Sequence, residues 1–309
     1  MPRIEEALSE YYRLCGCGEE RCTGKREGTF KVIPRDFSVD GKVAIVTGAG
    51  RGIGKAIALT MAEAGADITV VARSTKQIEQ TAEEIRQLGR KALAVPTDVT
   101  KEDQVKEAVE QTLLHFGRID ILVNNAGIDT PMKPVAFIPG AKFFGWELAG
   151  DNWDKQLTPE EWHQVIDTNL TGAFLFVQAV GPHMLRQKKG KVINISSNSA
   201  ELGTTYSAPY CVSKAALSMF TRCLASEWAP FNICVNAIGP GDTNTEMMAQ
   251  YMKDPAVAKV VLDAIPAGRM GEPREIALLA LYLASEASNF MNGQTVYIDG
   301  GQLGRGAGI

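Results

Sequence analysis

Short apolar runs alternate with longer amphipathic runs along the chain from Asp40 onward. The first apolar run, 42–47, is unbroken, which is typical of a strand buried on both faces of a parallel sheet. The runs between such strands repeat apolar residues at helical spacing. This alternation predicts an α/β fold, a doubly wound parallel sheet with its ligand site at the carboxyl ends of the strands. The strands expected in this half are 42–47, 68–72, 92–96 and 119–123, and the helices are 55–64, 77–88 and 102–116.

The second half of the chain continues the same alternation. Thr158, Pro159 and Glu161 have the sequence of a helix start, with Thr158 as the N-cap and Glu161 completing a capping box. We expect this helix to run towards Leu185 and to carry Asn169 at a local irregularity. The other expected elements are strands at 191–196, 233–238 and 295–298, and helices at 210–228 and 275–285.

A glycine-rich turn joins the first strand to the first helix. Residues 48–54 read Gly-Ala-Gly-Arg-Gly-Ile-Gly. Glycine permits unusual backbone angles and the close approach of a ligand. A helix N-terminus adds unpaired N–H groups and the positive end of the helix dipole. A strand, a glycine turn and a helix in this order therefore predict a phosphate cradle.

Tyr210 and Lys214 are four residues apart in the expected helix 210–228, so they share one face of it. An unperturbed phenol has a pKa of about 10, and a nearby ammonium lowers that pKa by favouring the phenolate. Such a pair suits proton transfer near neutral pH. Ser197, on a different element, is a candidate to hydrogen-bond the oxygen that is oxidised or reduced. The Tyr–Lys spacing alone is common in helices, so its meaning depends on the rest of the sequence.

Two segments are candidates for the wall of a substrate pocket. Residues 128–158 form an enlarged insertion rich in Phe, Trp and Gly, which is too aromatic for a disordered loop. We consider two interpretations of it, a lid or pocket wall and a subunit contact, and the sequence does not separate them. Residues 242–268 are expected to form one or two small helices over the substrate. Their Met and Val residues suit an adaptable apolar lining, or ordinary core packing.

An N-terminal extension, residues 1–38, precedes the single expected domain at 39–309. Cys15, Cys17 and Cys22 have a spacing that suggests zinc, but a structural zinc site needs four ligands and the histidines lie far away in the sequence. We therefore expect a packed or oligomer-contacting extension and no metal site. The other cysteines are expected to be small buried hydrophobic residues: Cys211, Cys223 and Cys234.

Composition excludes several classes of protein. A formal net charge of −4 argues against nucleic acid as the main partner. No apolar run approaches the roughly 20 residues of a membrane span, and residues 1–10 lack the apolar region of a secretory signal. Six cysteines in 309 residues do not indicate a disulfide scaffold. We expect a cytoplasmic protein with a small-molecule partner and neither a membrane nor a nucleic-acid partner.

Several short motifs occur in order from about residue 40 to the end of the chain. They are Thr47-Gly48-x3-Gly52-x-Gly54, Asp98, Asn124-Asn125-Ala126-Gly127, Asn169, Ser197, Tyr210-x3-Lys214 and Pro240-Gly241. In this combination the sequence resembles the short-chain dehydrogenase/reductase family. The resemblance implies a Rossmann-type domain with a seven-stranded sheet, a bound nicotinamide dinucleotide and subunit interfaces formed by the last elements, so that a homotetramer (or a homodimer) is expected.

The resemblance also implies residue roles. Tyr210 is the general acid/base, and Lys214 lowers its pKa and holds the nicotinamide ribose. Ser197 polarises the substrate oxygen, and Asn169 holds a water that links Lys214 to solvent. The implied catalytic residues are therefore Asn169, Ser197, Tyr210 and Lys214.

The form of the dinucleotide is indicated by the end of the second strand. NAD-selective sites place an acid about 20 residues beyond the glycine turn. Here that position is Ala72, followed by Arg73 and Ser74, and an arginine can pair with a 2′-phosphate bidentately. Together with Arg51, this predicts NADP(H), with NAD(H) the less favoured form. The expected cofactor contacts are Gly48, Gly50, Arg51, Gly52, Ile53, Gly54, Arg73, Ser74, Asp98, Val99, Asn125, Ala126, Gly127, Tyr210, Lys214, Pro240, Gly241, Thr243 and Thr245.

These features predict an NADP(H)-dependent oxidoreductase that transfers hydride between nicotinamide and a ketone or secondary alcohol, with Tyr210 as general acid/base. One alternative is a 3-oxoacyl thioester reductase, acting on acyl carrier protein or CoA. Another is an NAD-dependent secondary-alcohol dehydrogenase. A redox-sensing protein that binds the dinucleotide without turnover is a third, although the complete catalytic set argues against it. The sequence fixes neither the substrate nor the direction of the reaction.

Overall fold

The structure is a computed structural model that describes residues 35–129, 132–136, 142–143, 146–147, 156–249 and 251–305. Arg35–Ile309 forms one compact unit. The expected extension at 1–38, with Cys15, Cys17 and Cys22, lies almost entirely outside the described residues. No helix in the described ranges is long and apolar enough to cross a membrane.

A seven-stranded sheet forms the centre of this unit, in the order β3-β2-β1-β4-β7-β8-β9. Every neighbouring pair in it is parallel. The predicted fold class, a Rossmann-type doubly wound sheet, is therefore confirmed. The strands are β1 Val43–Thr47, β2 Asp67–Ala72, β3 Ala92–Pro96, β4 Ile121–Asn124, β7 Gly190–Ile195, β8 Ile233–Pro240 and β9 Thr295–Ile298, and β5 Lys142–Phe143 pairs with β6 Trp146–Glu147 in a separate antiparallel ribbon.

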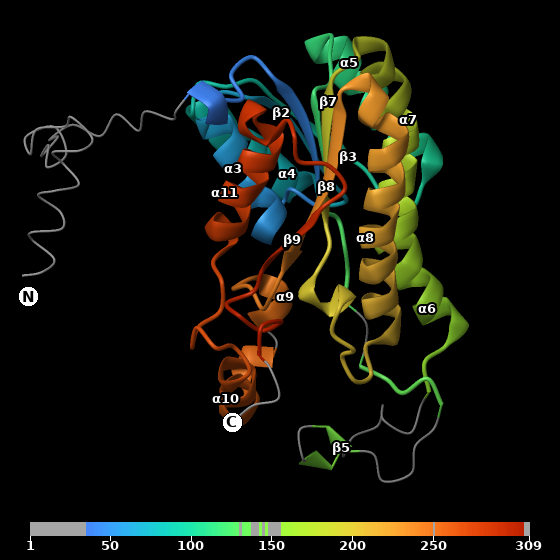
Figure 1. The fold of residues 1–309 in the computed structure, drawn as a ribbon, viewed down its shortest axis with the longest axis vertical. Helices are drawn as coiled ribbons and strands as arrows, with labels where there is room; N and C mark the ends of the chain where they lie inside the picture. The colour runs from blue at the N-terminus through green and yellow to red at the C-terminus, as the bar shows by residue number, and fades with distance from the viewer. Residues whose placement is uncertain are drawn as a thin grey trace, which may run out of the picture. The chain divides into compact units, whose positions relative to one another are not determined.

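Helices cover both faces of the sheet (Figure 1). Helix α3 contacts α4 and α11 on one face, and α5 contacts α7 on the other, where α8 packs against β8. The central strands are therefore covered on both faces and are mostly apolar, and all eight residues of β8 are buried. The helices are α3 Gly52–Glu63, α4 Thr75–Gln87, α5 Glu102–Phe116, α6 Pro159–Ile166, α7 Gly172–Gln187, α8 Ala208–Trp228, α9 Glu246–Ala249, α10 Pro255–Asp263 and α11 Pro273–Ala284, with short helical turns at Arg35–Phe37, Asn198–Ala200, Ala229–Phe231, Tyr251–Lys253 and Glu286–Ser288.

The helix expected to start at Thr158 is interrupted where predicted. The capping box is formed, since the Thr158 hydroxyl accepts from the N–H of Glu161 and the Glu161 carboxylate accepts from the N–H of Thr158. Between α6 and α7 the backbone widens into a π-helical turn, Asp167–Thr171, which contains Asn169. Such turns are rare and frequently found at functional sites.

One prediction about packing is wrong. Cys234 on β8 is buried, but Cys211 is partly exposed and Cys223 is exposed. Both of these lie on α8, only one side of which packs against the sheet. Their helical periodicity does not by itself say which face of the helix is covered.

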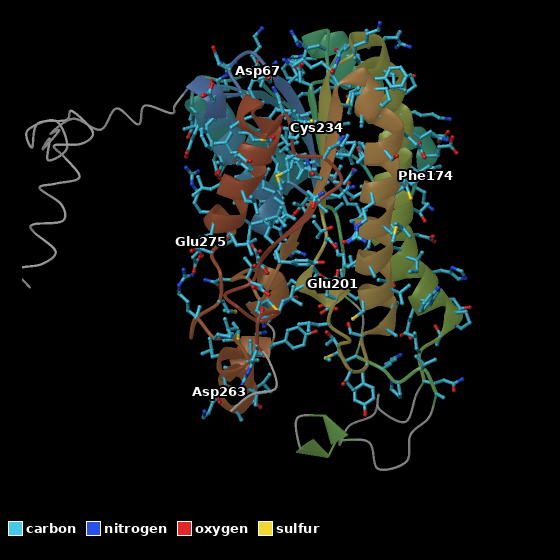
Figure 2. All side chains as sticks on the ribbon, viewed as in Figure 1. Asp67, Phe174, Glu201, Cys234, Asp263 and Glu275 are labelled. Atoms are coloured by element: carbon cyan, nitrogen blue, oxygen red, sulfur yellow. The ribbon has the colours of Figure 1, made fainter. Side chains whose placement is uncertain are left out.

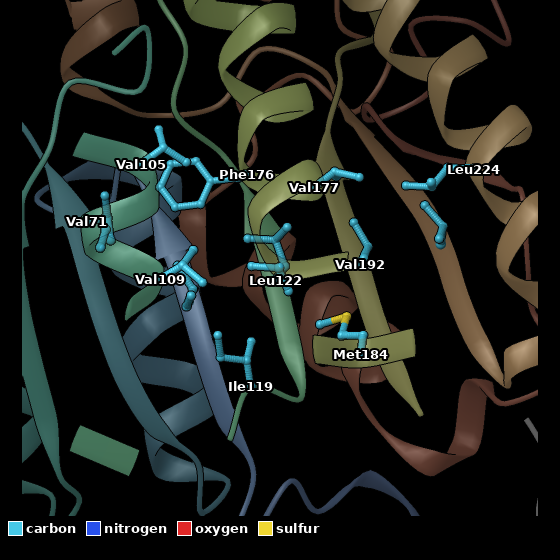
Figure 3. Close-up of a cluster of buried hydrophobic side chains, with 14 of the residues drawn as sticks. Val71, Val105, Val109, Ile119, Leu122, Phe176, Val177, Met184, Val192 and Leu224 are labelled. Atoms are coloured by element: carbon cyan, nitrogen blue, oxygen red, sulfur yellow. The ribbon is translucent and has the colours of Figure 1, made fainter. Parts of the chain in front are cut away.

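A large apolar cluster lies between the sheet and the helices α5, α7 and α8 (Figure 3). Leu122 of β4 has no exposed surface and packs in this cluster, whereas Leu114 of α5 is 87% exposed. We expect Leu122→Ala to lower the free energy of unfolding by about 2–5 kcal/mol, through lost burial and a cavity. The same substitution at Leu114 removes little packing and is expected to change it by less than about 0.5 kcal/mol. Urea titration of both variants measures the difference, and similar losses would contradict the packing described here.

Candidate active site

A cavity of about 550 Å³ opens at the carboxyl ends of the strands. Strand β1 leads towards β2 on one side while β4 and β7 lie on its other side, so the strand order reverses at β1 and β4. Crevices at such reversals are the usual ligand sites of doubly wound sheets. In Figure 2, Asp67 and Cys234 mark the amino ends of their strands, and Glu201 and Asp263 lie towards the opposite edge, where the cavity is.

The glycine turn has the shape of a phosphate cradle. Gly48 has a φ of +64°, and a Cβ there would lie 2.8 Å from Asn125 Nδ2 and 2.9 Å from Ala126 Cα. A Cβ on Gly54 would collide with the same amide nitrogen and with the Gly48 carbonyl. The N-cap of α3, Arg51, makes no side-chain capping bond, so its side chain leaves the first N–H groups of the helix open to a ligand. The residues present therefore fit a diphosphate bound at this helix end.

Thr47 and Asn125 join the ends of β1 and β4 beneath this turn. The Thr47 hydroxyl accepts from the backbone N–H groups of Asn125 (2.9 Å) and Ala126 (3.0 Å). The side-chain amide of Asn125 donates to the Thr47 carbonyl at 2.9 Å. These bonds fix the loop after β4 against the glycine turn.

The part of the cavity at the ends of β2 and β3 carries Arg73, Ser74 and Asp98. Burial raises the pKa of the Asp98 carboxyl, but bonds from the Thr100 N–H and hydroxyl and the positive charges of Arg73 and Lys101 outweigh it, so the net pKa is lowered. Asp98 is therefore a charged acceptor. Arg73 is exposed to solvent, and Ser74 makes no side-chain capping bond to α4. Both side chains thus remain available to a ligand.

Tyr210, Lys214 and Ser197 converge on the cavity from α8 and the end of β7. Lys214 Nζ lies 5.6 Å from the centroid of the Tyr210 ring and donates to the Ile195 carbonyl at 2.8 Å. Ser197 hydrogen-bonds the Tyr210 hydroxyl. The four-residue spacing on α8 therefore places the Lys214 ammonium beside the Tyr210 ring, and the loop after β7 brings the Ser197 hydroxyl to the phenol oxygen.

Asn169 lies just behind this group and does not line the cavity. Its amide accepts from the Ile128 N–H (2.8 Å) and donates to the Ile128 carbonyl (3.0 Å) and to Ser213 Oγ (3.1 Å). A Cβ on Gly127 would lie 3.3 Å from Asn169 Oδ1 and 3.5 Å from Lys214 Nζ, which places the two side chains together. In this structure Asn169 fixes the loop after β4, while its implied water contact stays a prediction.

The expected lowering of the pKa of Tyr210 by Lys214 is wrong for the chain on its own. Burial raises the pKa of Tyr210 to about 12, against a smaller lowering by the bond from Ser197, and the charges of Asp129 and Asp242 add to the rise. Burial also lowers the pKa of Lys214 to about 8. Lys214 is thus largely neutral at the pH where Tyr210 ionises, so it cannot favour the phenolate there.

The remaining wall of the cavity contains residues that the sequence did not single out. The Tyr251 hydroxyl donates to Asp129 Oδ2 at 2.8 Å, linking the turn Tyr251–Lys253 to the loop after β4. The Gln302 amide donates to Asp242 Oδ2 at 2.8 Å and accepts from Asn198 Nδ2 at 3.0 Å. These contacts join residues more than 50 positions apart, for which a single sequence gives no signal.

The structure therefore brings together every predicted site residue except Asn169 on one cavity. Thr243 and Thr245, in the loop after β8, also line it. The Cβ position of Gly52 lies 3.5 Å from Thr245 Cγ2, so Thr245 faces the phosphate cradle. The following segment, 242–268, contributes Met, Val and Tyr side chains from α9, the turn Tyr251–Lys253 and α10.

Much of the insertion at 128–158 lies outside the described residues. Of the part that is described, Ile128, Asp129 and Met132 line the cavity. Lys133 is paired with Glu161 at 2.6 Å, and the Leu157 N–H donates to the Pro134 carbonyl, so both ends of the insertion are tied to the start of α6. The choice between a lid and a subunit contact stays open.

Fold and site together define a dinucleotide-dependent oxidoreductase, with a phosphate cradle and a Tyr–Lys–Ser group in one cavity. The family model described as enoyl-(acyl carrier protein) reductase matches residues 48–302. The chain belongs to the short-chain dehydrogenase/reductase family, whose members act on CH–OH and C=O groups with a nicotinamide dinucleotide.

Relatives of several activities are similar over nearly the whole described unit. The 5-keto-D-gluconate 5-reductase of Escherichia coli (strain K12) is 38% identical over 267 residues, 86% of this chain and 97% of the relative. A 3-oxoacyl-(acyl carrier protein) reductase of Staphylococcus epidermidis is 37% identical over 84% of this chain and 98% of its own. A crystal structure of a gluconate 5-dehydrogenase from Burkholderia cenocepacia J2315 with NADP and tartrate has a TM-score of 0.77 at 36% identity, covering 87% and 98% of the two chains.

Proposed function

We propose that the protein is an NADP(H)-dependent oxidoreductase that moves hydride between nicotinamide C4 and a ketone or secondary alcohol. The convergence of Tyr210, Lys214 and Ser197 on the cavity that also contains the phosphate cradle carries this proposal. The NADP found in a relative of 36% identity supports the cofactor class. A proton donor beside a dinucleotide site is the arrangement that carbonyl reduction requires.

In the reductive direction the residues of this chain donate one proton and stabilise the negative charge that develops on the substrate oxygen. The dinucleotide, when bound, supplies the hydride. Ser197 donates a hydrogen bond to the substrate oxygen and orients it towards the Tyr210 hydroxyl. Tyr210 then gives its proton to that oxygen as negative charge develops there. The Lys214 ammonium stabilises the phenolate that remains, because opposite charges a few ångströms apart in a buried site attract strongly.

The preference for NADP(H) rests on the residues at the end of β2. Ala72 ends this strand, so no carboxylate stands there to accept a bond from a ribose 2′-hydroxyl. Arg73, Ser74 and Arg51 line the same part of the cavity and offer two guanidinium groups and a hydroxyl to a 2′-phosphate. NAD(H) is the alternative that the next experiment separates.

Arg73→Ala is expected to weaken NADPH binding about 10–150-fold, since a hydrogen bond to a charged group contributes about 1.5–3 kcal/mol. NADH binding should change little, because NADH has no 2′-phosphate. Fluorescence titration of both nucleotides measures the two dissociation constants. Lys76→Ala is the matched control, because it removes a positive charge from the first turn of α4 without touching the cavity. Equal losses for both nucleotides, or tighter NADH binding by the unchanged protein, would favour the NAD-dependent alternative.

Of the two alternative activities, one is supported by a relative and the other is disfavoured by the catalytic residues. A 3-oxoacyl thioester reductase is supported by the 37% identical relative with that name. Turnover of a 3-oxoacyl thioester in place of simple ketones would favour it. A redox sensor without turnover is disfavoured by the complete Ser197–Tyr210–Lys214 group, which dinucleotide binding alone does not need.

We also propose that the chain assembles as a homotetramer, with a homodimer as the alternative. Phe174 on α7 and Met219 on α8 are 45% and 53% exposed, and Phe174 packs against Phe220 of α8, so these two helices present an apolar outer face. Strand β9 pairs only with β8 among the described strands. Light scattering of the purified protein measures the number of subunits. A cytoplasmic location stays a prediction.

A further inference from the structure

Two carboxylates face the reacting position of the cavity from different loops. Asp129 follows β4 and Asp242 follows β8, and both line the cavity. Gly127, two residues before Asp129, approaches Lys214, since a Cβ on Gly127 would lie 3.5 Å from Lys214 Nζ. Gln302 bonds both Asp242 and Asn198, the neighbour of Ser197. Both carboxylates therefore lie near the catalytic group, and the charge of each raises the pKa of Tyr210.

Both carboxylates are held in place by neighbouring side chains. Asp129 Oδ2 accepts from the Tyr251 hydroxyl at 2.8 Å. Asp242 Oδ2 accepts from the Gln302 amide at 2.8 Å, while the Asp242 N–H donates to Gln302 Oε1 at 3.2 Å. Burial raises the pKa of the Asp242 carboxyl, and the bond from Gln302 offsets part of that rise by favouring the carboxylate.

The cations among the described lining residues are either at the predicted phosphate sites or already bonded within the protein. Among the described lining residues the cations are Arg51 and Arg73, at the predicted phosphate sites, and Lys214, which bonds the Ile195 carbonyl. Lys133, close in sequence to Asp129, is paired with Glu161 at 2.6 Å and does not line the cavity. The described part of the substrate site thus has no guanidinium or ammonium to receive a substrate carboxylate.

We propose that this site selects uncharged hydroxylated ketones and alcohols, or their ammonium analogues, and rejects carboxylates, with Asp129 and Asp242 as the residues that determine this specificity. The inference rests on the proposed function and sets the chain apart from its relatives named for gluconate substrates. A carboxylate on the substrate would meet like charges in a partly desolvated site, where Coulomb repulsion is strong. Rejection by a fixed like charge is a common means of specificity.

Substrates of the same carbon skeleton that differ in the charge of one terminal group test the proposal. L-Sorbose is 5-keto-D-gluconate with the carboxylate replaced by a CH2OH group, and 4-hydroxy-2-butanone and 4-amino-2-butanone are the neutral and cationic counterparts of acetoacetate. With NADPH as reductant, kcat/KM for the neutral member of each pair should exceed that for the anion at least about 100-fold, the effect of roughly two like-charge contacts of tenfold each. The cation should be at least as good as the neutral ketone. Equal or greater kcat/KM for the anions would overturn the proposal.

Variants then separate charge from hydrogen bonding. Asp129→Asn keeps an acceptor for Tyr251 but removes the charge, and should reduce the neutral-to-anion ratio about tenfold. Tyr251→Phe removes the bond but keeps the charge, and should preserve the ratio. Asp103→Asn, an exposed change on α5 outside the cavity, is the control and should leave all rates unchanged. An unchanged ratio in Asp129→Asn would refute a charge effect of Asp129.

Measuring the binding of the same compounds tests this inference independently of the proposed function. If no ketone is reduced, the proposed function fails, but dissociation constants of the same compounds for the protein saturated with NADP+ still report the order of charge preference. Tighter binding of the anions, or no binding by any of the compounds, would overturn the inference. Reduction of ketones with no preference for charge would overturn the inference alone.

Discussion

Tyr210→Phe is expected to lower kcat about 10²–10⁴-fold, the contribution typical of a positioned general acid. The variant removes the one hydroxyl that lies within reach of Ser197 and beside Lys214, while the ring that packs in α8 stays. Dissociation constants for NADPH should stay within about twofold, because the predicted phosphate contacts lie on other loops. Steady-state kinetics and fluorescence titration measure the two quantities on the same preparation.

Tyr282→Phe is the matched control for this change. Tyr282 lies on α11, where its ring is 5.9 Å from that of Phe37, and it does not line the cavity. Its loss of a hydroxyl should leave kcat unchanged. If Tyr210→Phe retained more than a tenth of the kcat of the unchanged protein, Tyr210 would not be the proton donor.

The pH dependence of the two directions follows from the same geometry. Burial raises the pKa of Tyr210 to about 12, so the phenol is protonated throughout the range in which enzymes are usually assayed. A protonated phenol is ready to donate, which suits reduction, whereas oxidation of an alcohol needs the phenolate as the base. Oxidation is therefore the direction that gains as the pH rises, and reduction is the direction that the protein on its own favours near neutral pH.

The architecture could be predicted from the sequence because its determinants are local. Strands such as β1 and β8 are buried on both faces and read as short, mostly apolar runs. The glycine turn and the capping box at Thr158 are each determined by a few neighbouring residues. The interruption at Asn169 was also predicted, and the structure shows it to be a π-helical turn.

The substrate end of the cavity could not be predicted because its contacts join distant segments. Gln302 reaches both Asp242 and Asn198, and Tyr251 reaches Asp129 across 122 positions. No periodicity or spacing links such residues. The pKa of Tyr210 was mispredicted for a related reason, since spacing on α8 reports the presence of Lys214 but not the depth of burial around both groups.

Lys214→Met should lower kcat for reduction by about 10²–10⁴-fold, the range for groups that take part in proton transfer. Methionine has a similar length and suits a buried site, so the change removes mainly the charge. The phenolate left by proton donation from Tyr210 would then have no cation beside it.

Because burial lowers the pKa of Lys214 to about 8, the ammonium is present below pH 8 and is lost as the pH rises through that value. In the unchanged protein kcat/KM for reduction should therefore fall above about pH 8, and in Lys214→Met this fall should disappear.

Lys191 provides a control on the same strand. Lys191 lies at the amino end of β7, is 7% exposed and donates to Ser288 Oγ at 3.1 Å, and burial lowers its pKa. Lys214 instead bonds the carbonyl of Ile195, the last residue of β7. Lys191→Met thus removes an equally buried ammonium at the edge of the sheet opposite the cavity. It should keep both the rate and the pH profile, even if the stability of the fold changes. If the decrease in kcat/KM above about pH 8 disappears in both variants, or in neither, it does not report the titration of Lys214. If it disappears in Lys214→Met alone, Lys214 supplies the positive charge that accompanies proton transfer.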